Sequence, residues 1–135
     1  MRDAIAFVIG NYFFTTFILG LVMGWISLLR RPRPHTPNVK VESFLSWYML
    51  LPIGISNLIN FVFHVFFGEM TARFIGWADS PFQREVGFAS LGIGIAGVLA
   101  YRAGLPFRFA AFIPPAVFSL GAAGGHIYEM IAANN

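Results

Sequence analysis

Four long apolar segments dominate this chain of 135 residues, and they limit its fold more than any other feature. We place them at residues 4–29, 43–68, 85–101 and 107–132. A helix needs about 20 apolar residues to cross a bilayer, so four such spans take up most of the chain. The sequence therefore predicts an all-α transmembrane bundle of four helices with short loops, forming a single domain over residues 1–135.

The composition supports this fold class. Charged residues make up only 11% of the sequence, whereas a soluble domain of this size has about 25%. The shortfall excludes an ordinary soluble globule, a disordered chain and a nucleic-acid-binding module, although the net charge is +3. The chain has no cysteine, which excludes disulfides, thiolate nucleophiles and iron–sulfur ligation.

Two connecting segments carry the charges that predict orientation. Residues 30–42 are rich in proline, so we expect an extended, basic, cytoplasmic loop there. Its cations are a topology signal or, alternatively, contacts for anionic lipid headgroups: Arg30, Arg31, Arg33 and Lys40. Residues 69–84 are amphipathic and, counted together with Glu85, slightly acidic, and we expect them on the outer side with both chain termini. Within them, Ser80 and Gln83 are spaced as a capping box for the next helix.

Small residues recur three or four positions apart along the predicted spans, a pattern typical of helices that pack closely in lipid. We predict a helix-packing interface, either internal or shared with a partner, at Gly20, Gly24, Ser90, Gly94, Gly97, Gly121 and Gly125. Residues 92–97 also match G-x-G-x-x-G, but a dinucleotide fingerprint needs a preceding strand, and this match lies inside an apolar span. No nucleophile elbow, His-Glu-x-x-His motif or phosphate loop occurs, so we expect no catalytic residues.

Polar side chains occur inside the second and fourth predicted spans, where they are costly and therefore informative. His64 and His126 each follow about 20 residues of their span, so at about 1.5 Å per residue they reach the same depth, near the outer boundary. The neighbouring polar residues share helix faces with these histidines or lie just above them. We predict one ligand or proton site from His64, His126, Glu129, Asn57, Asn60 and Glu85, with Glu69 as a further neighbour.

This predicted site admits several chemistries. Two histidines could ligate one haem iron axially, and histidines with carboxylates could bind a divalent metal. A His–Glu pair could relay protons or hold a cation, and a His beside an Asn could hydrogen-bond a quinone carbonyl. The alternative is that the polar groups only hydrogen-bond across helices and stabilise the bundle. The sequence specifies neither a cofactor nor a metal.

One segment resembles a known family. The run from Phe74 to Phe88, F-I-G-W-A-D-S-P-F-Q-R-E-V-G-F, resembles the central signature of an uncharacterised family of small bacterial four-helix membrane proteins. Residues 125–128, G-H-I-Y, are similar to the last helix of that family. The resemblance implies four spans and a bacterial inner (cytoplasmic) membrane, but no activity, because the family has no assigned function. It directs attention to Trp77, Ser80, Pro81, Gln83, Glu85 and His126.

Three hypotheses of function follow. The first is a non-catalytic accessory subunit that binds other membrane subunits, or a second copy of itself, through its glycine faces. The second is a small oligomeric carrier of protons, cations or an apolar ligand that uses the His/Glu cluster. The third is a b-type haem or quinone-binding membrane subunit, with His64 and His126 as the haem ligands. All three place membrane lipids around the chain, and none involves nucleic acid.

Overall fold

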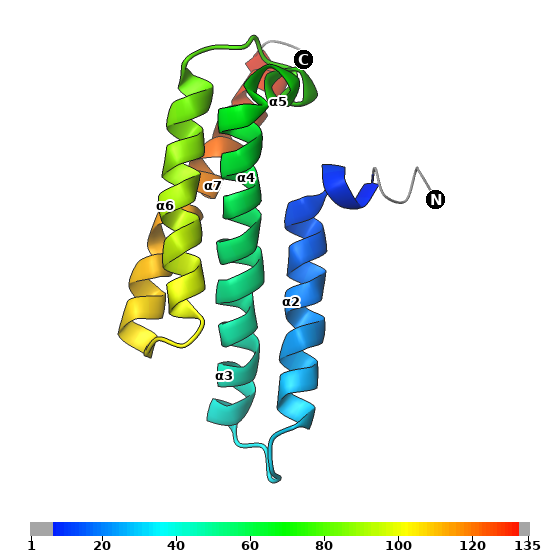
Figure 1. The fold of residues 1–135 in the computed structure, drawn as a ribbon, viewed down its shortest axis with the longest axis vertical. Helices are drawn as coiled ribbons and strands as arrows, with labels where there is room; N and C mark the ends of the chain where they lie inside the picture. Colours follow the sequence, from blue (N-terminus) through cyan, green and yellow to red (C-terminus); the bar gives the residue numbers. More distant parts are fainter. Residues whose placement is uncertain (1–6, 133–135) are drawn as a thin grey trace.

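The computed structural model describes residues 7–132 and contains helices and short connections, with no strand in that range (Figure 1). The elements are α2 (Tyr12–Leu29), α3 (Pro37–Tyr48), η1 (Met49–Ile55), α4 (Ser56–Phe66), α5 (Gly68–Ile75), α6 (Phe82–Ala100) and α7 (Leu105–Ala132). The long helices run side by side. The α2–α3 loop and the α6–α7 turn point to one end, here called the basic end, and α5 lies at the other, the α5 end (Figure 1). The predicted all-α class is confirmed.

Elements α3, η1 and α4 form one continuous helical rod, Pro37–Phe66. It begins where it does because the Thr36 side chain accepts a hydrogen bond from the backbone amide three residues on, and proline suits the first helical turn. Its middle is a π-helical turn around Pro52, which has no amide proton for the usual helical bond. The predicted loop over residues 30–42 is therefore wrong beyond Thr36, and the second apolar helix begins at residue 37 and not at residue 43.

Two further helix boundaries differ from the prediction. Residues 7–10 are helical, but a non-helical backbone at Asn11 separates them from α2, which begins at Tyr12; residues 4–6 of the expected first span lie outside the described range. Helix α6 begins at Phe82 without a side-chain cap, so the capping box expected from Ser80 and Gln83 is wrong. At this helix start, the carbonyls of Ser80 and Pro81 accept hydrogen bonds from the backbone amides of Gln83 and Arg84 (3.1 Å each). The Gln83 side chain bonds to α4 instead.

Three helices are long and apolar enough to cross a membrane: Tyr12–Leu29, Pro37–Phe66 and Leu105–Ala132. Helix α6, which corresponds to the predicted third span, is not among them. Its first turn carries Gln83, Arg84 and Glu85, which lower the mean hydropathy of a helix of only 19 residues. Three of the four predicted spans therefore correspond to helices that are long and apolar enough to cross a membrane, and the predicted third span does not.

Small residues let α2 and α6 approach the central rod closely. A Cβ atom added to Gly24 of α2 would lie 2.7 Å from the Phe44 ring. One added to Gly97 of α6 would lie 2.6 Å from the backbone nitrogen of Gly54. The observed approach therefore requires glycine at these two positions. The apolar core lies where the rod, α6 and α7 meet, at Met49, Ile53, Ala100 and Ala111.

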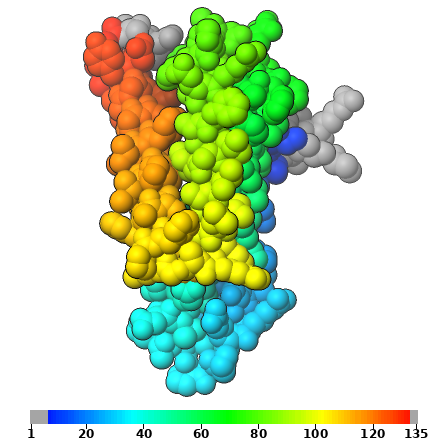
Figure 2. All heavy atoms as spheres, turned by 60° about the vertical axis from the view of Figure 1, so that its left-hand side comes forward, coloured from blue at the N-terminus to red at the C-terminus, as the bar shows by residue number. Residues whose placement is uncertain are grey.

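Helix α7 packs on the rest of the molecule along only part of its length. Arg108 and Ala111 are buried, but every described residue of α7 beyond Ala116 is exposed. Figure 2 shows this orange-to-red half along one edge of the molecule. The second half of α7 therefore forms one wall of an open groove.

Candidate functional site: a polar-walled groove between α4, α6 and α7

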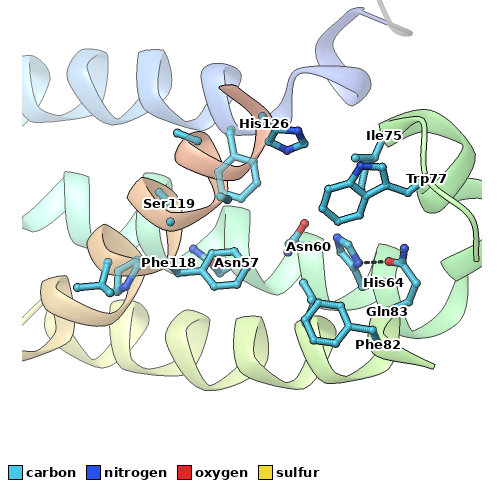
Figure 3. Close-up of a pocket in the computed structure, with 17 residues that line it drawn as sticks. Asn57, Asn60, His64, Ile75, Trp77, Phe82, Gln83, Phe118, Ser119 and His126 are labelled. Atoms are coloured by element: carbon cyan, nitrogen blue, oxygen red, sulfur yellow. Dashed lines mark hydrogen bonds between the residues drawn. The ribbon is translucent and has the colours of Figure 1, made fainter. Parts of the chain in front are cut away.

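A groove with a volume of about 730 Å³ opens at the α5 end of the bundle (Figure 3). Helices α4 and α6 form one wall and the exposed half of α7 forms the other. Most lining side chains are apolar, including Phe13, Ile75, Phe82 and Phe118. The volume is in the range of about 300–1,000 Å³ that is typical of small-molecule sites.

One wall of this groove is polar, because α4 places Asn57, Asn60 and His64 on a single helix face. These three residues are buried, each with 8% of its surface exposed. Asn60 joins three helices: its Oδ1 accepts a hydrogen bond from the Tyr12 hydroxyl (2.5 Å) and its Nδ2 donates one to the Ser90 hydroxyl (2.8 Å). Asn60 therefore holds α2, α4 and α6 together at the depth of the groove.

His64 is paired with Gln83 from the first turn of α6. The ring nitrogen Nδ1 of His64 lies 2.5 Å from the Gln83 Oε1 atom, as the dashed line in Figure 3 shows. An amide oxygen only accepts hydrogen bonds, so Nδ1 carries the proton. In the neutral ring, Nε2 is then left as a hydrogen-bond acceptor. The sequence pattern treated Gln83 as a helix cap, and its pairing with His64 becomes visible only in the fold.

Aromatic rings line the groove near the α5 end. The ring of Trp77 stacks on that of His126 from α7, with centroids 5.5 Å apart and planes 28° apart. His64 and His126 thus line the same groove, as their common depth in the sequence led us to expect. The stacked Trp77–His126 pair is the one aromatic pair in the described range that includes a residue from the exposed half of α7.

A second, more polar cavity of about 540 Å³ lies on the other side of the His64–Gln83 pair. Charged side chains from the α5–α6 region line it: Glu69, Asp79 and Arg84. His64 and Gln83 line both cavities, so this hydrogen-bonded pair forms part of the partition between the groove and the polar cavity.

The remaining predicted site residues lie elsewhere. Glu129 and Glu85 are exposed and line neither cavity, and Glu69 lines only the polar cavity and forms an ion pair with Arg73 on α5. Within residues 7–132, no group of three histidines or carboxylates is arranged to hold a metal ion. The hypothesis of a His-carboxylate metal site thus has no supporting arrangement in the described range. Tyr12 was missed because one tyrosine in an apolar helix carries no pattern.

The predicted small-residue positions divide into two groups. Five of them lie at contacts between helices: Gly20, Gly24, Ser90, Gly94 and Gly97. For example, a Cβ atom on Gly94 would lie 2.8 Å from the Leu58 side chain on α4. Gly121 and Gly125, on the exposed half of α7, have no such neighbour within 4 Å among the described residues. An interface at these two positions stays a prediction.

The basic end is organised around Arg108. This residue lies in the first turns of α7, with only 3% of its side chain exposed. It donates hydrogen bonds to both carboxylate oxygens of Glu42 (2.6 and 3.0 Å) and to the carbonyls of Ala100 and Tyr101 (2.8 Å each). A buried guanidinium is stable only when its donors are paired in this way. Arg108 therefore ties α7 to α3 and to the end of α6.

The comparisons with known proteins give one result. The model of a family of unknown function, DUF6790, matches residues 10–135. No curated protein and no solved structure matches the chain. The predicted resemblance to an uncharacterised family is confirmed, and the match extends over nearly the whole chain. The chain belongs to DUF6790, a family of unknown function.

Proposed function

We propose that this chain is a multi-pass membrane protein that binds an apolar molecule with a hydroxyl head group in the groove between α4, α6 and α7. The polar wall of the groove carries this proposal. Asn57, Asn60 and His64 are costly in an apolar span, and they lie at the back of a cavity large enough for a small molecule. Polar groups that served only to join helices would not need an open cavity beside them.

The polar side chains of the wall leave hydrogen-bond acceptors free, which favours a ligand whose head group donates a hydrogen bond. Asn60 is occupied by Tyr12 and Ser90. Asn57 uses its Nδ2 to donate to the Ile53 carbonyl (2.9 Å), which leaves its Oδ1 as an acceptor. With Nε2 of His64, the wall thus presents two acceptors to the groove. A hydroxyl group can donate to either acceptor, whereas an ether or a hydrocarbon cannot.

The test compares the binding of hexadecanol with that of its methyl ether, by the thermal shift of the purified protein in detergent. We expect hexadecanol to bind, and the ether and His64→Leu to bind about tenfold more weakly, as for the loss of one hydrogen bond of about 1.4 kcal/mol. His35→Leu, a histidine change at the basic end, is the matched control and retains binding. Equal binding of alcohol and ether, unchanged by His64→Leu, contradicts the proposal.

A second candidate function is a non-catalytic accessory subunit of a larger membrane complex. The observation in its favour is that Gly121 and Gly125 leave the exposed half of α7 open to close approach by another transmembrane helix. Gly121→Leu should then release the chain from the partner with which it copurifies, whereas Gly92→Leu should not, although Gly92 is equally open. Copurification that Gly121→Leu leaves unchanged rules out this face.

The haem hypothesis has one observation in its favour, since His64 and His126 line the same groove. Both rings already have partners, because Gln83 bonds to His64 and Trp77 stacks on His126. A reduced-minus-oxidised spectrum of the protein from its own membrane decides: haem bands that His64→Leu abolishes support the hypothesis, and their absence rejects it.

We also propose that α6 is the fourth span and that the basic end faces the cytoplasm of a bacterial inner membrane. In support, α6 lies alongside α4 and buries its small-residue face there (Figure 1). The excess of arginine and lysine at the basic end supports the orientation. The test is a fusion, after residue 135, to a reporter enzyme that works only outside the cytoplasm. We expect this fusion to be active, because the proposed topology places residue 135 on the outer side of the membrane.

A further inference from the structure

A second cavity at the basic end has a lining unlike that of the groove. It has a volume of about 380 Å³ and lies beside the last turns of α2, the start of the α2–α3 loop and α3. Its lining combines two arginines, two aromatic rings and two long apolar side chains: Arg30, Arg31, Trp47, Tyr101, Met23 and Ile26. The arginines thus give this small cavity a positively charged region, and Met23 and Ile26 give it an apolar region.

The charges around this cavity do not cancel. Among the described residues, Glu42 is the one carboxylate at the basic end, and it is bound by Arg108. No ion pair within residues 7–132 involves Arg30 or Arg31. Further cations at the same end, Arg33, Lys40 and Arg102, add to the positive charge. The cavity therefore attracts an anion.

The aromatic rings indicate what kind of anion fits. Trp47 and Tyr101 meet edge to face with centroids 5.1 Å apart, and the Arg102 guanidinium lies 5.9 Å from the Tyr101 ring. Trp and Tyr beside Arg, next to an apolar helix surface, are typical of the headgroup level of a bilayer. Ile26 and Met23 lie about one and two turns before Arg30 on α2 and extend the cavity along that apolar surface. A free phosphate would use the arginines alone.

We propose that this cavity binds an anionic phospholipid, with the phosphate on Arg30 and Arg31 and the first part of an acyl chain along Met23 and Ile26. Arginine is suited to this role because its guanidinium presents several donors to phosphate oxygens. Ser27, which also lines the cavity, adds a hydroxyl near the polar part. This inference depends on the proposed membrane location and not on the groove or its ligand.

The experiment is native mass spectrometry of the whole chain in detergent, titrated separately with phosphatidylglycerol and phosphatidylcholine of identical acyl chains. We expect the wild type to prefer phosphatidylglycerol. Arg30→Gln with Arg31→Gln should weaken its binding about 30-fold, or about 2 kcal/mol at about 1 kcal/mol per cation. The matched control, Arg33→Gln with Lys40→Gln, removes the same charge from the same end outside the cavity and should keep most of the binding.

Three outcomes would overturn the proposal. The first is an equal loss in both double variants, which means general attraction to positive charge. The second is the absence of a preference for phosphatidylglycerol. The third is displacement of the lipid by inorganic phosphate at millimolar concentration, which means a free-phosphate site. Hexadecanol binding in the groove is measured on the same samples, so failure at one site is distinguished from failure at the other.

A charge-neutral variant keeps the proposal testable if the arginine variants do not fold. Met23→Trp fills the apolar part of the cavity, whereas Val22→Trp adds the same ring on the neighbouring exposed position. Met23→Trp should weaken phosphatidylglycerol binding at least about fivefold, roughly 1 kcal/mol, and Val22→Trp should leave it unchanged. Equal binding by these two variants also contradicts the proposal.

Discussion

The two halves of α7 differ in how they are held. Its first turns are fixed by Arg108, which bonds to Glu42 on α3 and to two carbonyls at the end of α6. Its second half, beyond Ala116, is exposed throughout the described range (Figure 2). No side-chain hydrogen bond joins that half to another described element. Helix α7 is thus packed against the other helices at the basic end and separated from them by the groove at the α5 end.

The contrast follows from where the polar groups find partners. At the basic end, the guanidinium of Arg108 belongs to α7, so α7 must pack there to keep its donors paired. At the α5 end, the polar groups of α4 are paired with α2 and α6, through Asn60 with Tyr12 and Ser90 and through His64 with Gln83. Because these pairs form without α7, its second half can stand apart and leave room for the groove.

The largest expected effect comes from removing the hydrogen bonds of Arg108 at the basic end. Arg108→Leu leaves two backbone carbonyls and Glu42 without their donor and should lower the free energy of unfolding by about 3 kcal/mol. We expect the low end of the usual range because the Glu42 side chain is 47% exposed. The control, measured alongside it in an SDS titration in mixed micelles, is Arg102→Leu, which changes an exposed arginine in the connection between α6 and α7. An equal loss of unfolding free energy in the two variants would show that the hydrogen bonds of Arg108 do not hold α7 on α3 and α6.

The next largest effect comes from the close contact between α6 and the central rod. Gly97→Ala places a methyl group 2.6 Å from the Gly54 backbone nitrogen, which cannot move aside as a flexible side chain would. Overpacking of this kind should cost about 2 kcal/mol of unfolding free energy. Gly92→Ala on the same helix meets no neighbour within 4 Å and should gain up to about 1 kcal/mol from helix propensity. A gain in both variants would contradict the close approach of α6 to the rod.

A smaller effect is expected where α2 meets the polar wall. Tyr12→Phe removes the hydroxyl that donates to Asn60, and one hydrogen bond between membrane helices contributes about 0.6 kcal/mol on average. The same titration should therefore show a small but measurable loss. Tyr128→Phe, an exposed tyrosine near the end of α7, is the matched control and should show none. A loss only in Tyr128→Phe would mean that α7 closes on the bundle.

The smallest effect is expected at the open end of α7. Glu129→Gln should change the free energy of unfolding by less than about 0.5 kcal/mol, because Glu129 is exposed and lines neither cavity. It should also leave hexadecanol binding unchanged in the thermal-shift assay. A loss of binding comparable to that of His64→Leu would return Glu129 to the ligand site, as the sequence had predicted.

The fold was largely predictable because periodic apolar patterns act locally. The three apolar helices and the common face of Asn57, Asn60 and His64 follow from spacing alone. Errors arose where one residue had two plausible roles. Pro37 belonged to the first turn of a helix and not to a loop, and Gln83 had a partner in α4 and not in its own helix turn.

The candidate site was only partly predictable, because several of its contacts join residues that are far apart along the chain. His64 and His126 share a depth that can be counted in residues, and both line the groove. The stacking of Trp77 on His126 joins positions 49 residues apart (126 − 77), and the ion pair of Glu42 with Arg108 joins positions 66 residues apart. No local spacing rule connects such pairs.

The sequence alone determined the helical class, the apolar helices, the basic character of one end and the residues able to form a polar wall, because these depend on composition and on the helical period. The tertiary structure decided which of those residues meet. It buried Arg108 against Glu42, placed Gln83 on His64, packed the small residues of α6 on α4, and left the second half of α7 open over a groove. These outcomes depend on how helices pack and on where each buried polar group finds its partner, and one chain's local pattern does not contain that information.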